Sequence, residues 1–127
     1  MRVDSGLVDC RILVVEDEYA HAEDIRRELI EAGAIVVGPV PTIHKAMRLV
    51  EAEARIDGAV LDINLGGEMV FPVAEALRAR SVPFLFATGY DSGRTPEAYK
   101  DIQRIEKPVT PGEAARQLGR LLRSVRA

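Results

Sequence analysis

Five short runs of mostly apolar residues alternate with longer amphipathic segments along this 127-residue chain. The runs span residues 12–15, 35–37, 59–61, 84–87 and 102–105. Short apolar runs of this kind are typical of strands that are buried on both faces of a sheet. Strands that alternate with helices favour a single parallel sheet with helices on both faces, so the sequence predicts an α/β fold.

The segments between the runs carry apolar residues at helical spacing. Residues 19–32 predict a helix that ends before Gly33, and Thr42 is placed to cap a second helix that continues to residue 53. A third helix is expected between Gly67 and residue 79, with Pro72 in its first turn. The stretch 91–100 has only a weak helical stripe. The last helix is marked by an apolar stripe at Ala114, Leu118, Leu121 and Val125.

Composition excludes several classes of protein. With 47% apolar and 29% charged residues the chain can bury a core, and its length predicts one domain over residues 11–127 after a loose lead-in at 1–10. A net charge of -3 provides no basic surface for direct nucleic-acid binding. The apolar runs are too short to cross a membrane, and the single cysteine, Cys10, rules out an internal disulfide framework. We therefore expect a cytoplasmic protein without a membrane insertion.

Polar side chains follow or end four of the five predicted strands. Glu16 and Asp17 follow the first strand, Asp62 the third, Thr88 the fourth and Lys107 the fifth. Because ligands bind outside the carboxyl ends of the strands in an open parallel sheet, we expect these side chains to share one edge. Three carboxylates repel one another unless a cation lies between them, and oxygen ligands suit magnesium. The charges therefore predict a Mg²⁺ site.

An aspartate beside Mg²⁺ can act as a nucleophile toward phosphorus and form an aspartyl phosphate. Phosphoryl transfer depends on positioning and on neutralising the charge of the phosphoryl oxygens. The ammonium of Lys107 and the hydroxyl of Thr88 are suited to that task. Asp62 is therefore a candidate phosphoacceptor.

Four segments together resemble the receiver domain of two-component response regulators. They are residues 12–18 (ILVVEDE), 61–65 (LDINL), 87–89 (ATG) and 107–108 (KP), and the resemblance extends over nearly the whole chain from Arg11 onward. It implies a flavodoxin-like, five-stranded parallel sheet of the kind found in receivers. It also implies a signalling protein that accepts phosphate, rather than an enzyme acting on an external substrate.

The resemblance also implies a role for each motif residue. Asp62 would accept the phosphoryl group from a histidine kinase or a histidine phosphotransfer protein. Mg²⁺ would be held by Glu16, Asp17, Asp62 and the backbone carbonyl of Asn64, while Thr88 and Lys107 would contact the phosphoryl group. Glu16 stands where the family more commonly has aspartate.

Residues 86–90 (FATGY) are similar to the signature of the FAT GUY subclass of single-domain receivers, whose fourth helix is often weak or rearranged. This agrees with the weak helical stripe of residues 91–100. Receivers usually have an aromatic residue three positions before the Lys-Pro pair, where this chain has Arg104. We therefore expect the signalling surface to involve the loop after Thr88 and Tyr90 instead.

The leading prediction is a stand-alone receiver that binds an unknown downstream protein when phosphorylated or acts as a phosphate sink. The oligomeric state stays open, a homodimer included. One alternative is a degenerate receiver fold that serves only as an interaction module. A less favoured one is a phosphohydrolase that uses an aspartyl phosphate, because Asn64 lacks the second carboxylate that such an enzyme needs as its acid and base.

Overall fold

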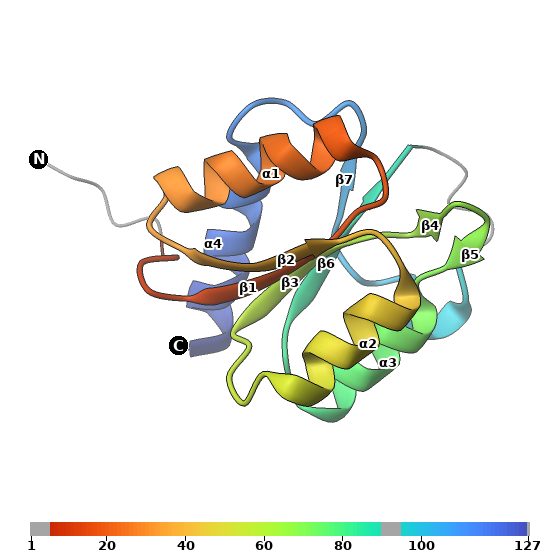
Figure 1. The fold of residues 1–127 in the computed structure, drawn as a ribbon. Coiled ribbons are helices and arrows are strands. Elements are labelled where there is room, and N and C mark those ends of the chain that lie inside the picture. Colours follow the sequence, from red (N-terminus) through yellow and green to blue (C-terminus); the bar gives the residue numbers. More distant parts are fainter. Residues whose placement is uncertain (1–5, 90–94, 127) are drawn as a thin grey trace, which may run out of the picture.

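The computed structural model describes residues 6–89 and 95–126 and contains one main sheet with helices on both faces (Figure 1). The main strands are β1 (Arg11–Val15), β2 (Ile35–Val40), β3 (Gly58–Asp62), β6 (Phe84–Thr88) and β7 (Arg104–Glu106). A small hairpin consists of β4 (Asn64–Leu65) and β5 (Glu68–Met69). The helices are α1 (Tyr19–Glu31), α2 (Ile43–Ala52), α3 (Phe71–Ala79) and α4 (Glu113–Arg126), with a 3₁₀ turn η2 (Glu97–Tyr99).

The sheet has five parallel strands in the order β2-β1-β3-β6-β7. The reversal of strand order beside β1 and β3 is the point at which open α/β sheets bind their ligands. All five carboxyl ends lie at one edge, so residues far apart in the sequence meet there. The predicted α/β fold with a receiver-like sheet is confirmed.

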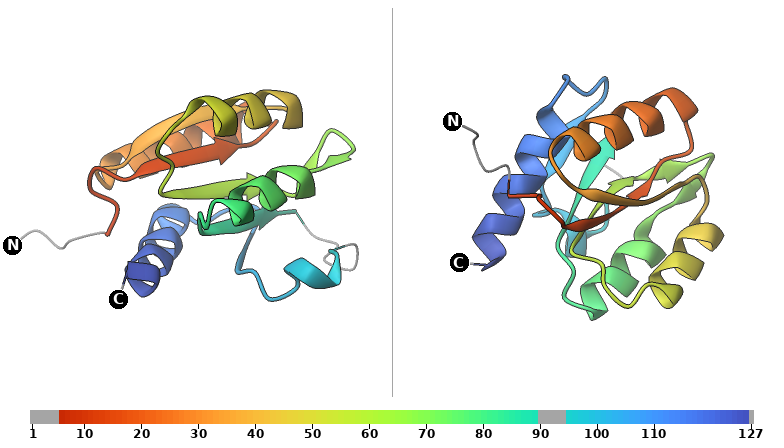
Figure 2. Two further views of the ribbon diagram at one scale, coloured as in Figure 1. Left: turned by 90° about the horizontal axis from the view of Figure 1, so that it is seen from below. Right: turned by 60° about the vertical axis from the view of Figure 1, so that its left-hand side comes forward.

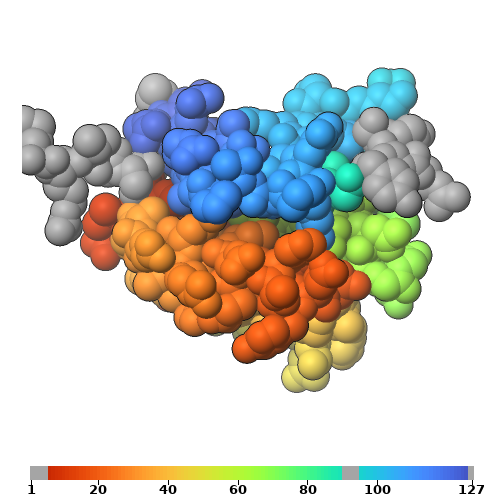
Figure 3. Space-filling model, turned by 90° about the horizontal axis from the view of Figure 1, so that it is seen from above, coloured from red at the N-terminus to blue at the C-terminus, as the bar shows by residue number. Residues whose placement is uncertain are grey.

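Two layers of helices enclose the sheet (Figures 1 and 2). Helices α1 and α4 cover one face, where Ile25, Leu29 and Leu118 pack against Ile12 and Val14 of β1. Helices α2 and α3 cover the opposite face and enclose a second apolar cluster. Alternation of side chains along each strand divides them between the two clusters. From above, α1 lies beside the C-terminal segment of the chain (Figure 3).

Residues 6–10 pack against the layer formed by α1 and α4. Leu7 and Cys10 are buried and belong to that cluster. Asp9 N donates to Gly33 O at 2.9 Å, which joins this segment to the loop that follows α1. The domain boundary expected at residue 11 stays a prediction.

Several elements differ from the sequence-based expectations. Strand β2 does not end before Gly38 but continues to Val40, with a register irregularity in its pairing to β1. Proline is tolerated there because β2 is an edge strand. In α4, Leu122 is buried, whereas Val125 is 58% exposed. The expectation that Val125 belongs to the buried stripe of this helix is therefore wrong. Between β6 and β7 the described residues, 95–103, form only the turn η2, in agreement with the weak stripe in the sequence.

Among the described helices, none has both the length and the apolar character that a transmembrane span requires.

Candidate active edge of the sheet

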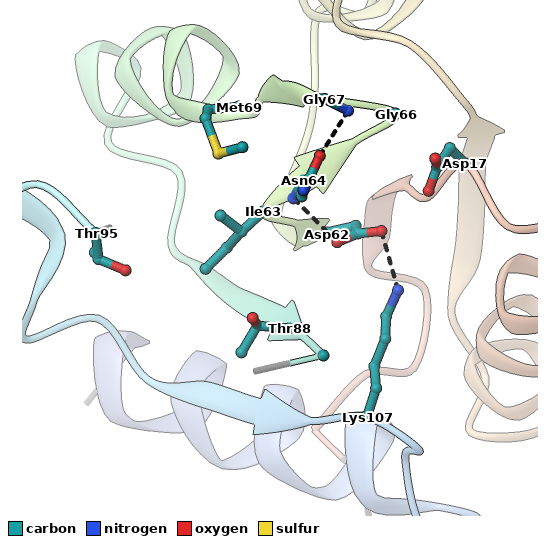
Figure 4. Close-up of a pocket in the computed structure, with 11 residues that line it drawn as sticks. Asp17, Asp62, Ile63, Asn64, Gly66, Gly67, Met69, Thr88, Thr95 and Lys107 are labelled. Carbon is teal, nitrogen blue, oxygen red and sulfur yellow. Dashed lines mark hydrogen bonds and ion pairs between the residues drawn. The ribbon is translucent and has the colours of Figure 1, made fainter. Parts of the chain in front are cut away.

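The carboxyl ends of four strands bring the predicted site residues together (Figure 4). Glu16 and Asp17 follow β1, Asp62 is the last residue of β3, Thr88 is the last residue of β6, and Lys107 follows β7. Glu16, Asp62 and Thr88 are buried, whereas Asp17 is exposed. In β3 and β6 every residue before Asp62 and Thr88 is apolar, so the polar side chains of these two strands are confined to their carboxyl ends.

Lys107 connects two of the carboxylates. Its Nζ lies 2.7 Å from Glu16 Oε1 and 3.0 Å from Asp62 Oδ2. The side chains of Glu16, Asp62 and Lys107 are only 1%, 7% and 13% exposed. Since buried charges are costly unless they are paired, this arrangement stabilises three ionisable groups in one small volume.

Protonation of Asp62 depends on its surroundings. Burial raises the pKa of Asp62 to about 7, the neighbouring Glu16 adds to the rise, and Lys107 opposes it. For Lys107, burial alone would lower the pKa, but the hydrogen bonds to Glu16 and Asp62 outweigh that effect and raise it. Lys107 therefore stays a cation, while Asp62 without a further cation is poised between its neutral and ionised forms at neutral pH.

Glu16, Asp17 and Asp62 form a group that fits a divalent cation. Each offers a carboxylate oxygen, and these oxygens lie within 4.8 Å of one another. Opposite oxygen ligands of a magnesium ion are about 4.2 Å apart, so a small adjustment would complete the site. Burial and the neighbouring Glu16 raise the pKa of Asp62, and a cation held by this group would oppose that rise.

The hairpin β4–β5 forms one side of this edge. Asn64 N donates to Asp62 Oδ1 at 3.2 Å, and Gly67 N donates to the side-chain oxygen of Asn64 at 2.7 Å. Gly66 and Gly67 have positive φ values of 62° and 101°, which glycine adopts without strain. A side chain at Gly66 would point toward Asp17 Oδ2. The sequence analysis did not identify this hairpin, although a Gly-Gly pair between short strands is its usual signal.

A cavity of about 430 Å³ opens at this edge. Asp17, Asp62, Thr88 and Lys107 line it, together with Ile63, Met69 and the hairpin glycines (Figure 4). Thr95, which the sequence analysis did not single out, also lines the cavity and is 5% exposed. No local motif marks Thr95, because its place depends on how the segment after β6 returns to the sheet.

The sequence analysis discussed Tyr90 and Arg104 in connection with the signalling surface, and the structure describes only Arg104. Tyr90 lies outside the described residues, so its role stays a prediction. Arg104 begins β7, and its guanidinium carbon lies 5.9 Å from the centre of the Phe86 ring. The position usually occupied by an aromatic residue in receivers therefore holds a cation packed on an aromatic ring.

Comparison with known proteins identifies relatives among solved structures. No family model matches the chain, and no curated protein matches it either. The solution structure of SdrG from Sphingomonas melonis Fr1 is 40% identical, with a TM-score of 0.75 over 91% of this chain and 98% of that one. The BeF3-activated conformation of SdrG, given as from Pseudomonas melonis Fr1, is 37% identical over 96% of this chain and 99% of that one, with a TM-score of 0.73.

The crystal structure of a response regulator receiver protein from Sinorhizobium medicae WSM419 gives a TM-score of 0.79 at 25% identity, covering 91% of this chain and 96% of that one. With this fold, this edge and these relatives, the chain belongs to the response regulator receiver family.

Proposed function

We propose that Asp62 accepts a phosphoryl group from a histidine kinase or a histidine phosphotransfer protein in a Mg²⁺-dependent reaction. The phosphorylated protein then binds a downstream protein or serves as a phosphate sink, in the cytoplasm and without contact to nucleic acid. One observation carries this proposal: Lys107 Nζ lies 3.0 Å from Asp62 Oδ2 at the edge where Glu16 and Asp17 also lie. That it acts without an attached output domain stays a prediction.

In the proposed transfer, an oxygen of Asp62 forms a bond to phosphorus while the bond from phosphorus to the donor's imidazole nitrogen breaks. The donor nitrogen keeps the electron pair. Lys107 Nζ donates to Asp62 Oδ2, and the same ammonium group can donate a hydrogen bond to an oxygen of the incoming phosphoryl group. Thr88, buried at the end of β6 and lining the same cavity, offers a hydroxyl to another phosphoryl oxygen.

Glu16, Asp17, Asp62 and the backbone carbonyl of Asn64 would hold the magnesium ion. When bound, the ion supplies positive charge that favours the ionised carboxylate of Asp62 and neutralises phosphoryl oxygens. Glu16 is buried and held beside Lys107, whereas Asp17 is exposed, so an ion bound by both would be reached from the solvent on the side of Asp17.

We further propose that the protein belongs to the FAT GUY subclass. Residues 86–90 carry the motif, and the single turn η2 follows it in place of a full helix among the described residues.

Intact-mass measurement after incubation with acetyl phosphate tests the phosphoacceptor proposal. We expect the wild-type protein to gain one phosphoryl group with Mg²⁺ and none with a chelator. Asp62→Ala should gain none, while Asp101→Ala, which removes an exposed aspartate, should behave like wild type. Uptake by Asp62→Ala would refute the proposal, and absence of uptake by every protein would favour the alternative of a pure interaction module.

A further inference from the structure

The cavity at the active edge is larger than a phosphoryl group alone requires. Its volume of about 430 Å³ lies within the range of pockets that hold small organic ligands. The charged side chains of Asp17, Asp62 and Lys107 line one part of it. Ile63 and Met69 line another part, and Figure 4 shows these two on one side of Asp62, opposite Asp17. The proposed phosphoryl transfer uses the charged part and gives no role to the apolar one.

Met69 belongs to the hairpin that follows Asp62. It pairs with Asn64 between β5 and β4, and Asn64 lies two residues after Asp62. Val70 N donates to Ile63 O at 2.8 Å, directly beside this pair. These backbone contacts hold Met69 next to the segment that leaves the phosphoacceptor, so its side chain has a defined starting point at the cavity wall.

Met69 is neither a fully buried nor a fully exposed residue. It is partly buried, packs against the apolar cluster beneath α2 and α3, and lines the cavity. Ile63, which lines the cavity with it, is 8% exposed. A thioether is flexible and polarisable and makes favourable contacts with aromatic rings. The apolar part of the cavity is therefore suited to a flat, uncharged ring.

The donor group of a histidine kinase or a histidine phosphotransfer protein is such a ring. Because the attacking and leaving atoms lie roughly in line with phosphorus, the donor nitrogen must lie beyond the phosphoryl group as seen from Asp62. An imidazole that is protonated on its second nitrogen leaves as a neutral molecule. An apolar wall accommodates a neutral ring at a lower cost in desolvation than a carboxylate anion.

We propose that Met69 is a specificity-determining residue that contacts the imidazole ring of the phosphodonor. The ring lies against the thioether and Ile63 while Lys107 contacts the phosphoryl group. An oxygen of Asp62 bonds to phosphorus, and the phosphorus–nitrogen bond breaks. Its electron pair stays on the nitrogen, and the ring, already protonated on its second nitrogen, leaves as neutral imidazole. This inference rests on the proposed phosphorylation of Asp62.

Two small donors that differ in their leaving groups test this contact. Phosphoimidazole releases imidazole and acetyl phosphate releases acetate, so only the first presents a ring to Met69. Intact-mass time courses with Mg²⁺ give the rate of phosphorylation by each donor. For Met69→Ala we expect the rate with phosphoimidazole to fall by about fivefold while the rate with acetyl phosphate stays the same. Met69→Leu, which keeps an apolar side chain of similar volume, should restore most of the lost rate.

Met47→Ala is the matched control. Met47 on α2 is also partly buried and packs against the same apolar cluster, but it lies outside the lining of the cavity. The ratio of the two rates should therefore equal that of wild type. Met69→Gln keeps the length of the side chain and replaces the thioether by an amide. It should show the same donor-selective loss, and it tests the contact where truncation to alanine destabilises the hairpin.

The outcomes separate this inference from the proposed function. If Met69→Ala and Met69→Gln slow both donors equally, or slow neither, Met69 does not contact the ring and the inference is wrong, while the receiver assignment stands. The same holds if the wild-type protein accepts phosphate from acetyl phosphate but not from phosphoimidazole. If the wild-type protein accepts phosphate from neither donor, the proposed function fails and this inference with it.

Discussion

Lys107 Nζ lies 3.0 Å from Oδ2 of Asp62, although 45 residues separate the two in the sequence. The parallel sheet explains the contact, because β3 and β7 both end at the same edge. Lys107 is thereby held within reach of any group that becomes attached to Asp62. The pair is the central element of the proposed phosphoryl chemistry.

The variant Lys107→Ala tests whether Lys107 acts on the phosphoryl group and not on the binding of Mg²⁺. The variant lacks the cation that faces the phosphoryl oxygens, and loss of one such donor commonly slows a reaction by about 100-fold. Magnesium affinity should be retained or rise slightly, because a positive charge near the three carboxylates is removed. Calorimetric Mg²⁺ titration and phosphorylation rates measure the two effects. The exposed Lys100, changed to Ala, is the control. Loss of Mg²⁺ binding in Lys107→Ala would contradict this division.

In metal-free buffer, the pH dependence of the free energy of unfolding reports the protonation of the Asp62 carboxylate. Its pKa of about 7 in the folded protein exceeds the ordinary value of 3.8, so the folded state binds the proton more tightly. The stability contributed by this group is present below the ordinary value and is lost as the pH rises through 7. Asp62→Asn does not titrate there. We therefore expect Asp62→Asn to become increasingly more stable than wild type between about pH 4 and about pH 7, with the difference levelling off above that range.

Urea unfolding of the two proteins with a chelator measures that difference, and added Mg²⁺ should reduce it by stabilising the wild-type protein. A difference that stays constant over this pH range would show that Asp62 titrates at its ordinary value.

Glu28 joins two helices that are distant in the sequence. Its carboxylate on α1 accepts hydrogen bonds from Gly112 N at 2.9 Å and from Ala115 N at 3.0 Å, at the start of α4. These bonds satisfy amide groups that a helix leaves unpaired at its first turn. Glu28→Ala should lower the free energy of unfolding by about 1–3 kcal/mol, with a smaller loss for Glu28→Gln.

Urea unfolding measures the effect of Glu28, and Glu31→Ala on the exposed part of the same helix serves as the control. Equal stability of Glu28→Ala and Glu31→Ala would show that the two hydrogen bonds contribute nothing measurable.

Tyr99 connects the turn η2 to helix α3 through a ring contact and a hydrogen bond. Its ring stacks on Phe71 at a centroid distance of 5.3 Å, and its hydroxyl donates to Glu75 Oε2 at 2.8 Å. Removal of the hydroxyl in Tyr99→Phe should cost about 1 kcal/mol, whereas Tyr99→Ala should cost about 3–5 kcal/mol because it also leaves a cavity. Thermal or urea unfolding distinguishes the two. Equal losses of stability in the two variants would show that the hydroxyl of Tyr99, and not its ring, stabilises the fold.

Much of the fold follows from local sequence. The apolar runs of β1, β3 and β6 are buried at nearly every position, which is why their strands could be predicted from composition alone. The hairpin β4–β5 was missed because its strands have two residues each and offer no periodicity. In α4, Val125 continues the apolar stripe of the sequence but is 58% exposed, so periodicity alone did not show where the buried part of the helix ends.

The candidate site was predictable to the extent that its residues end strands. Asp62 ends β3, Glu16 and Lys107 directly follow β1 and β7, and the three side chains meet as expected. Thr95 and Arg104 could not be assigned their places in this way, because they depend on the return of the segment after β6 and on packing against Phe86. Such contacts arise from tertiary structure and have no signature in a short stretch of sequence.

The most direct test of the account is to locate the phosphoryl group in the chain. Borohydride reduces an aspartyl phosphate to homoserine, which peptide mass spectrometry can assign to a position. After phosphorylation with acetyl phosphate and Mg²⁺, the account predicts homoserine at position 62 and at no other aspartate. Homoserine at Asp17 instead, or at several acidic residues without dependence on Mg²⁺, would contradict the assignment of Asp62 as the phosphoacceptor.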